Sequence, residues 1–252
     1  MKKIVTILGA RPQFVKAAVL SRVIKEHGQI EEVIVHTGQH FDANMSAVFF
    51  DEMNIPQPTY NLQIHSLSHG AMTGQMLEKI EEILVLEKPD AVLVYGDTNS
   101  TLAGALAAKK LHIKVVHIEA GLRSFNMNMP EEINRILTDR ISDLLCCPTQ
   151  IAMENLEKEG FLSLPIQLLN TGDIMKDAVA YYSAFSSSKS NIVDRLHLKS
   201  NRFVLATLHR QENTDDLEKL EQIIIGLEEI HKSNEVVLPL HPRTKKIMEQ
   251  HH

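Results

Sequence analysis

The sequence predicts an α/β protein with two Rossmann-like domains, each built on a parallel sheet covered by helices. Short apolar runs alternate with amphipathic stretches along nearly the whole chain, which is typical of βαβ units. The apolar runs are continuous, as expected of strands buried on both faces. The alternation pauses once, at a Ser-rich segment, and then restarts, which indicates a second domain.

The first domain is assigned to residues 1–170. It opens with the apolar run Lys3–Gly9, and Pro12 suits the first turn of a helix over Gln13–Glu26. A long helix over Ser68–Glu87 has apolar residues at helical spacing and ends before Pro89. The remaining predicted strands are Glu32–Thr37, Ala91–Tyr95, Lys114–Ile118, Leu144–Cys147 and Gln167–Asn170, and the remaining helices are Ser100–Lys110, Glu131–Ser142 and Ala152–Glu159.

The second domain is assigned to residues 171–252. The small polar residues of Ser183–Asn191 predict a surface loop or linker near its start. Only two strand–helix units follow, so this domain is expected to be incomplete. Its predicted strands are Phe203–Leu208 and Val236–Leu240, and its predicted helices are Asp216–His231 and Thr244–Gln250.

The composition is that of an ordinary globular protein. Hydrophobic residues make up 44% of the 252 residues and charged residues 23%, which excludes a disordered or fibrous protein. The formal charge of −6 gives no general attraction to nucleic acid or to an anionic membrane, so neither is expected as a partner. No apolar run approaches the roughly 20 residues that span a bilayer. The adjacent Cys146 and Cys147 are predicted to be reduced core residues, which indicates the cytoplasm.

A binding site is expected where polar segments follow the strands. In open parallel sheets, ligands bind outside the carboxyl ends of the strands. Five stretches occupy such positions in this chain, and a sixth, Pro130–Arg135, comes shortly after one of them. The five are Gly9–Lys16, His36–His40, Gly96–Asn99, His117–Ser124 and His209–Asn213.

Two kinds of charged side chain stand in these segments. Cations near loop–helix junctions suit a phosphate-bearing ligand, and carboxylates can move protons where burial or mutual repulsion raises their pKa. Together they fit a nucleotide-activated substrate that loses a proton beside its leaving group. The cations are Arg11, Lys16, Arg123 and Arg135, and the carboxylates are Asp97, Glu119 and Glu131.

Several candidate site residues also have a purely structural interpretation. Arg11 and Lys16 could lie on a solvated first turn, and Asp97 could cap the following helix. Glu131 would favour a helix dipole in any case, and His209 could be a satisfied core histidine.

Metal and dinucleotide sites are not expected. His36 and His40 have no third ligand at a fitting spacing. The segment Gly9-Ala10-Arg11 lacks the second and third glycines of the dinucleotide fingerprint, so NAD is not indicated and no cofactor is predicted.

The motifs resemble those of the non-hydrolysing UDP-N-acetylglucosamine 2-epimerase family, in the family's order and over essentially the whole chain. They are Gly9-Ala-Arg-Pro-Gln with Lys16, Gly96-Asp-Thr-Asn-Ser-Thr, His117-Ile-Glu-Ala-Gly-Leu-Arg-Ser, Pro130-Glu-Glu-Ile-Asn-Arg and His209-Arg-Gln-Glu-Asn. The resemblance implies a GT-B fold, with a UDP-sugar substrate held between two Rossmann-like domains. It implies inversion of carbon 2 through elimination and re-addition of UDP, for bacterial surface polysaccharide synthesis.

The resemblance also implies roles for the residues named above. Acid and base catalysis falls to Asp97, Glu119, Glu131 and, from the second domain, His209, with the base and the acid left unassigned. Arg11 and Lys16 are expected to contact the nucleotide sugar, with Arg123 as a further substrate-binding cation, and Arg135 to support the pyrophosphate or the carboxylates. Gln39 and His40 would lie near an allosteric UDP-sugar site. The family is usually dimeric, and the apolar stripe Met72, Met76, Ile80 and Ile83 could serve that interface or the core.

Two departures from the family pattern matter. The family's second domain continues past the equivalent of residue 252 with a Ser-Gly-Gly and Glu motif that holds the nucleotide, so weak binding and low turnover are expected of this chain. The segments Ala10–Gln13 and Arg123–Asn126 resemble relatives that act on UDP-2,3-diacetamido-2,3-dideoxy-glucuronate. Both sugars stay open as substrates.

Two other functions remain as alternatives. A GT-B glycosyltransferase would move the sugar to an acceptor and needs a single base. A non-catalytic UDP-sugar-binding relative would bind without proton exchange. Several carboxylates around one sugar favour the epimerase.

Overall fold

The computed structural model describes residues 1–39, 53, 55–199, 202–208, 211–240 and 242–251. Within it the chain divides into two compact units, Met1–Ser183 and Ala184–His252. The division expected at residue 170 falls earlier than this. Ile174 and Tyr182, which follow it, pack against the core of the first unit and extend that unit into the next helix.

The first unit is a parallel sheet of seven strands in the order β3-β2-β1-β4-β5-β6-β7. The order reverses between β1 and β4, and such a switch point is where open sheets form their ligand crevice. In chain order the elements are β1 (Lys2–Leu8), α1 (Arg11–His27), β2 (Ile30–His36), β3 (Tyr60–Asn61), α3 (His69–Glu87), β4 (Ala91–Tyr95), α4 (Asn99–Lys110), β5 (Lys114–Ile118), α5 (Pro130–Ile141), β6 (Leu144–Cys147), α6 (Gln150–Lys158), the 3-10 turn η1 (Phe161–Ser163), β7 (Gln167–Asn170) and α7 (Ile174–Lys189).

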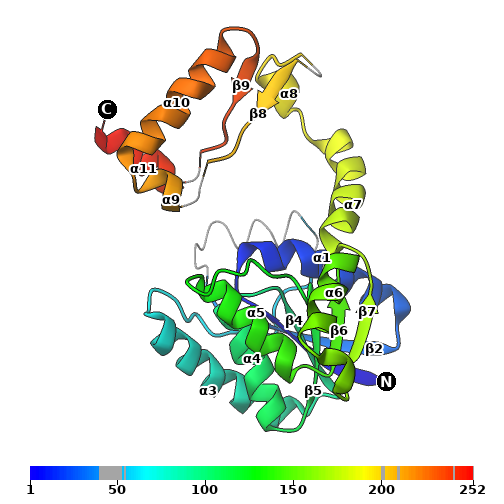
Figure 1. The fold of residues 1–252 in the computed structure, drawn as a ribbon. Helices are drawn as coiled ribbons and strands as arrows, with labels where there is room; N and C mark the ends of the chain where they lie inside the picture. The colour runs from blue at the N-terminus through cyan, green and yellow to red at the C-terminus, as the bar shows by residue number, and fades with distance from the viewer. Residues whose placement is uncertain (40–52, 54, 200–201, 209–210, 241, 252) are drawn as a thin grey trace. The chain divides into compact units, whose positions relative to one another are not determined.

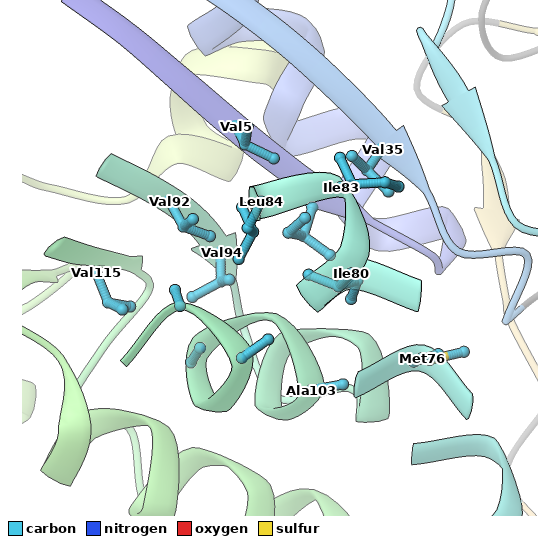
Figure 2. Packing of buried hydrophobic residues seen from close by; sticks show 14 of the residues in the cluster. Val5, Val35, Met76, Ile80, Ile83, Leu84, Val92, Val94, Ala103 and Val115 are labelled. Carbon is cyan, nitrogen blue, oxygen red and sulfur yellow. The ribbon is translucent and has the colours of Figure 1, made fainter. Parts of the chain in front are cut away.

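One face of this sheet is covered by α3 and α4. Val5, Val35, Val92, Val94 and Val115 project from the strands toward these helices (Figure 2). The α3 stripe that begins at Met72 lies in the same cluster, with exposed fractions of 9% or less. This stripe is therefore core, and it is not free to form a dimer interface.

The other face is covered by α1 and the beginning of α7. Phe14 and Tyr95 are the largest buried side chains of this cluster. Cys146 and Cys147 are buried free thiols in β6, as predicted from the sequence. Burial, with Asp139 nearby, raises the pKa of Cys147 to about 12, so this thiol stays protonated and inert.

The second unit pairs two parallel strands and is shorter in regular structure than the first. None of the described helices in either unit is long and apolar enough to cross a membrane. The elements that follow α7 are α8 (Ile192–Arg195), β8 (Phe203–Leu205), α9 (Gln211–Thr214), α10 (Leu217–His231), β9 (Glu235–Val237) and α11 (Pro242–His251).

The loop predicted over Ser183–Asn191 is wrong, because α7 continues through it to Lys189 (Figure 1). The serines bond back to the helix itself: the Ser183 hydroxyl donates to the Val179 carbonyl, and that of Ser188 to the Phe185 carbonyl at 2.8 Å. Small polar residues thus satisfy their hydroxyls inside a helix where composition alone favours a turn.

Candidate functional site

The site lies at the carboxyl edge of the sheet, where β1, β4 and β5 lead into loops and helices. Close packing at this edge requires Gly9. A Cβ at that position would stand 2.1 Å from the hydroxyl oxygens of both Thr37 and Ser100. These two hydroxyls bond each other at 2.8 Å, which fixes the end of β2 to the first turn of α4.

Gln13 organises the turn between β1 and α1. Its side-chain oxygen accepts the N–H groups of Gly9 and Ala10 at 2.8 and 3.0 Å. Its amide nitrogen reaches the Tyr95 carbonyl at 2.8 Å, and lies 3.0 and 2.9 Å from the hydroxyls of two threonines at the start of α4. The side chain is buried and fully engaged, so Gln13 is a brace rather than a ligand-binding group.

Lys16 and Glu119 form the first charged pair of the site. The Lys16 ammonium bonds Oε2 of Glu119, and their side chains are 9% and 19% exposed. Gly96 lies directly against both, since a Cβ there would stand 3.2 Å from that oxygen and 3.4 Å from the Lys16 nitrogen. Helix α1 and the loops after β4 and β5 therefore meet at one point.

Asp97 and Arg135 form the second pair, one residue after Gly96. The Arg135 guanidinium bonds Oδ2 of Asp97 and, through another nitrogen, Oε2 of Glu132. Burial alone would lower the pKa of Arg135, but the two carboxylates raise it above its ordinary value. Asn134 adds a further tie, because its amide donates to the Asp97 carbonyl at 2.9 Å.

Glu132 is a site residue that the sequence interpretation missed in favour of its neighbour Glu131. Its carboxylate is 1% exposed and accepts the N–H of Ser124 at 3.0 Å and that of Phe125 at 2.9 Å. Burial acts to raise its pKa, but these N–H groups and Arg135 lower the pKa below its usual value. Glu132 thus holds the loop after β5 and orients Arg135. The apolar residues of α5 gave no signal for its burial, because Ile133 and Leu137 are 42% and 46% exposed.

The structure leaves two of the predicted site residues exposed. Glu131 stands in the first turn of α5 and Arg11 in the first turn of α1. Both helices begin at the edge where Asp97 and Lys16 lie, so both side chains are on the solvent side of the same site.

Arg123 does not reach this site as a free cation. Its side chain is 1% exposed and lies between Asp139 and Glu159, with three nitrogen–carboxylate contacts of 2.7 to 2.8 Å. It also donates to the Leu122 carbonyl at 2.7 Å. Burial acts to lower its pKa, but the two carboxylates raise it well above the ordinary value. In this structure Arg123 is a structural cation, and its assignment to substrate binding stays a prediction.

Gln39 is half-buried against the first turn of α4, and its place near an allosteric site stays a prediction. Its side-chain oxygen accepts the Ser100 N–H at 3.0 Å and the Ser100 hydroxyl at 2.8 Å. His40 and His209, predicted for the allosteric and catalytic sites, lie outside the described residues. No cluster of three or more metal-ligating side chains is found in the described part of the chain.

A family model described as UDP-N-acetylglucosamine 2-epimerase matches residues 22–252. The chain belongs to this epimerase family. A Pseudomonas aeruginosa member, a UDP-2,3-diacetamido-2,3-dideoxy-D-glucuronate 2-epimerase, is 55% identical over 249 residues, which are 98% of this chain and 69% of that protein. Among solved epimerases, the Methanocaldococcus jannaschii enzyme in complex with UDP-GlcNAc and UDP is 44% identical, with a TM-score of 0.87 over 99% of this chain and 68% of that one.

The epimerase of Neisseria meningitidis bound to UDP-GlcNAc is also similar. It is 30% identical, with a TM-score of 0.85 over 98% of this chain and 69% of its own. These epimerases are GT-B-like, so the predicted fold class is confirmed. The chain spans about 68% of the length of its epimerase relatives.

Proposed function

We propose that the chain acts as a UDP-sugar 2-epimerase, an isomerase that inverts carbon 2 of a UDP-linked 2-acetamido sugar. The observation that carries this proposal is the meeting of two carboxylate–cation pairs, Glu119 with Lys16 and Asp97 with Arg135, on either side of Gly96. Carboxylates supply the proton transfers, and cations beside them stabilise a departing diphosphate.

The reaction proceeds by elimination and re-addition. A carboxylate takes the proton from carbon 2, the electrons of that C–H bond form the double bond to carbon 1, and the C–O electrons leave with UDP. UDP then adds back to the 2-acetamidoglucal while a proton returns to the opposite face of carbon 2. We assign the acid and base roles to the group of Asp97, Glu119, Glu131 and His209, and diphosphate binding to Arg11, Lys16 and Arg135.

The Lys16–Glu119 pair links substrate binding to the availability of the Glu119 carboxylate for proton transfer. A diphosphate is a strong competitor for an ammonium group, because charge-assisted bonds to phosphate are among the strongest in proteins. When the substrate takes Lys16, Glu119 loses its partner and its oxygen becomes available for a proton. Binding and activation of the carboxylate are then one event.

The substrate is UDP-N-acetylglucosamine or UDP-2,3-diacetamido-2,3-dideoxy-glucuronate, the sugars named for the relatives described above. We further propose a homodimer in the cytoplasm. Exposed apolar side chains that could form such a contact include Val85 and Leu86 at the end of α3. The buried free thiols of β6 are compatible with a reducing compartment.

Incubation with each UDP-sugar in heavy water tests the activity. We expect deuterium at carbon 2 and formation of the epimer without any acceptor, followed by mass spectrometry and proton NMR. Glu119→Gln should lower the exchange rate by about 100- to 10,000-fold, since it removes a proton-transfer group while keeping the side chain's shape. Glu81→Gln, an exposed site on α3, is the matched control and should leave the rate unchanged.

Other outcomes would contradict the proposal. Sugar transfer that depends on an added acceptor would indicate a glycosyltransferase. Binding of both UDP-sugars without exchange would indicate a non-catalytic binder. Full exchange in the Glu119→Gln variant would remove Glu119 from the proton transfer.

A further inference from the structure

A network of buried hydrogen bonds lies next to the site, and its residues take no part in the chemistry proposed above. His117 on β5 and Asp139 on α5 are both 0% exposed. Nδ1 of His117 lies 2.7 Å from Oδ1 of Asp139, and Nε2 lies 2.7 Å from the carbonyl oxygen of Gly96. The other oxygen of Asp139 accepts from Arg123 at 2.7 Å and from the Gly121 N–H at 3.1 Å.

These contacts indicate which ring nitrogens of His117 carry a hydrogen. A peptide carbonyl can only accept, so Nε2 must carry a hydrogen to bond Gly96. Asp139 already accepts two hydrogen bonds at its other oxygen, one of them from a guanidinium, which favours the carboxylate form. A carboxylate facing Nδ1 requires a hydrogen there as well. His117 therefore donates from both ring nitrogens, as an imidazolium.

The surrounding charges balance this assignment. The ionisable groups that contact this hydrogen-bonded network around His117 include Asp139 on α5, Arg123 after β5, Glu159 after α6 and Cys147 on β6. Two cations, His117 and Arg123, then face two anions, Asp139 and Glu159, with Cys147 neutral. Buried ionic groups persist only where they are paired and hydrogen-bonded in this way.

The network reaches the site at Gly96, whose carbonyl contacts the His117 ring. Its N–H donates to the Ile118 carbonyl at 3.0 Å, and its carbonyl accepts from His117, so consecutive residues of β5 grip both polar groups of Gly96. Asp97 follows Gly96 directly, and Glu119 follows His117 by two residues. These two hydrogen bonds therefore connect the loops that carry Asp97 and Glu119.

We propose that His117 is a positioning residue: as an imidazolium held by Asp139, it fixes the Gly96 carbonyl and so sets Asp97 against Glu119. The inference rests on the proposed function for its catalytic consequence, but not for the hydrogen bonds themselves. Substrate affinity comes from other groups, so loss of His117 should act on turnover.

Nitrogen NMR of the histidine rings tests the hydrogen bonds without requiring activity. In protein labelled with 15N-histidine, at neutral pH, we expect both ring nitrogens of one buried histidine to show the shifts of a protonated imidazolium. The signal is assigned by its absence in the His117→Gln variant. A neutral ring, or an Nε2 without hydrogen, would overturn the proposal.

Asp139→Asn and Asp143→Asn form the matched pair of variants. Asp143 also anchors β5, by accepting the Val115 N–H at 2.9 Å, but it does so at the end of the strand away from the site. Asp139→Asn should remove the imidazolium signal and shift the amide signals of Gly96 and Asp97. Asp143→Asn should change neither, and equal shifts in both variants would contradict the proposal.

Kinetics then separate positioning from simple support of the fold. His117→Phe should lower the rate of carbon-2 exchange by roughly 100-fold, the cost of a misplacement on the order of 1 Å, with KM unchanged. His117→Gln retains a donor for the Gly96 carbonyl and should recover part of that loss at similar stability to the Phe variant. An unchanged rate in His117→Phe, or a loss confined to KM, would overturn it. No exchange in the parent chain would reject the proposed function alone, and the NMR result would still decide whether His117 grips Gly96.

Discussion

Two residues facing each other across the site, Gly96 and Glu119, adopt left-handed backbone conformations, with φ of 61° and 70°. For a residue with a side chain this geometry costs about 1–2 kcal/mol. Glu119 is held there because its own N–H and that of Ala120 both bond the Cys146 carbonyl, at 3.0 and 3.1 Å. These two hydrogen bonds to the end of β6 offset the backbone strain at Glu119 and hold its carboxylate against Lys16.

Gly96→Ala should damage both stability and exchange. The new methyl group would meet Glu119 and Lys16, and φ of 61° would be strained by about 1–2 kcal/mol. We expect that loss in urea unfolding and a fall in carbon-2 exchange of roughly 100-fold. Gly74→Ala in α3, where a Cβ meets nothing within 4 Å, should instead stabilise the protein by about 0.5–1 kcal/mol. Similar effects from the two variants would show that Gly96 has no special conformational role.

Glu32 gives a pH dependence of stability. Burial raises the pKa of its carboxyl group, and the hydrogen bond from Thr6 only partly offsets this effect. An acid whose pKa is raised by folding stabilises the folded state below its unfolded pKa, about 4.3, and loses that contribution as the pH rises through the folded value.

Glu32→Gln should therefore raise the free energy of unfolding at neutral pH, and the gain should disappear below about pH 4. Urea unfolding of both proteins at the two pH values measures this difference. Glu31→Gln, an exposed change on the same strand, is the control and should show little pH-dependent gain. A variant that is less stable than the parent at neutral pH would contradict the assignment.

The sequence located most of the candidate site but not its internal support. Asp97, Glu119, Lys16 and Arg135 converge as expected, because the carboxyl ends of parallel strands share one edge. Arg123 could not be separated from them by sequence, since its burial depends on two distant carboxylates that only the fold brings near.

At the scale of the elements, most strands and helices of the first unit were predicted within a few residues, including the four-residue strands β6 and β7, whereas β3 and the 16-residue helix α7 were not predicted. Strands of the second unit end early: β8 stops at Leu205 and β9 at Val237, although apolar residues continue beyond both. Apolar sequence indicates burial, but a strand also needs a neighbour for its hydrogen bonds. The helix α7 was missed because its Ser-rich half satisfies its hydroxyls internally.

Ser186→Pro tests whether α7 is continuous. Proline in a helix interior removes one hydrogen bond and clashes with the preceding turn, a cost of about 3 kcal/mol. We expect amide exchange over residues 183–189 to become much faster in this variant, as measured by mass spectrometry. Ser186→Ala should keep or increase protection. Fast exchange over these residues in the parent protein would restore the loop that the sequence predicts.

At the scale of the whole molecule, the two units differ in how much core they possess. The first unit contains three clusters of buried apolar side chains. In the described part of the second unit, the buried apolar side chains are Leu208 and Leu220, and the sheet has two strands. A two-stranded sheet is marginal without more packing.

Unfolding should therefore occur in two steps. We expect the second unit to lose amide protection at a lower urea concentration than the first, by hydrogen exchange resolved on peptides from each unit. Gly226→Ala in α10, where a Cβ meets nothing within 4 Å, should move only the first of these steps to higher urea. A single transition shared by both units would contradict the prediction.

The embedded amide of Gln13 changes how family members should be compared. A glutamate at this position would have no hydrogen to give when ionised, so it could not serve the Tyr95 carbonyl as Gln13 does. Its presence would require a compensating change in the turn around Tyr95. Position 13 therefore reports on how this turn is built rather than on the substrate, and the exposed side chain of Glu131 is a better guide to which sugar each enzyme accepts.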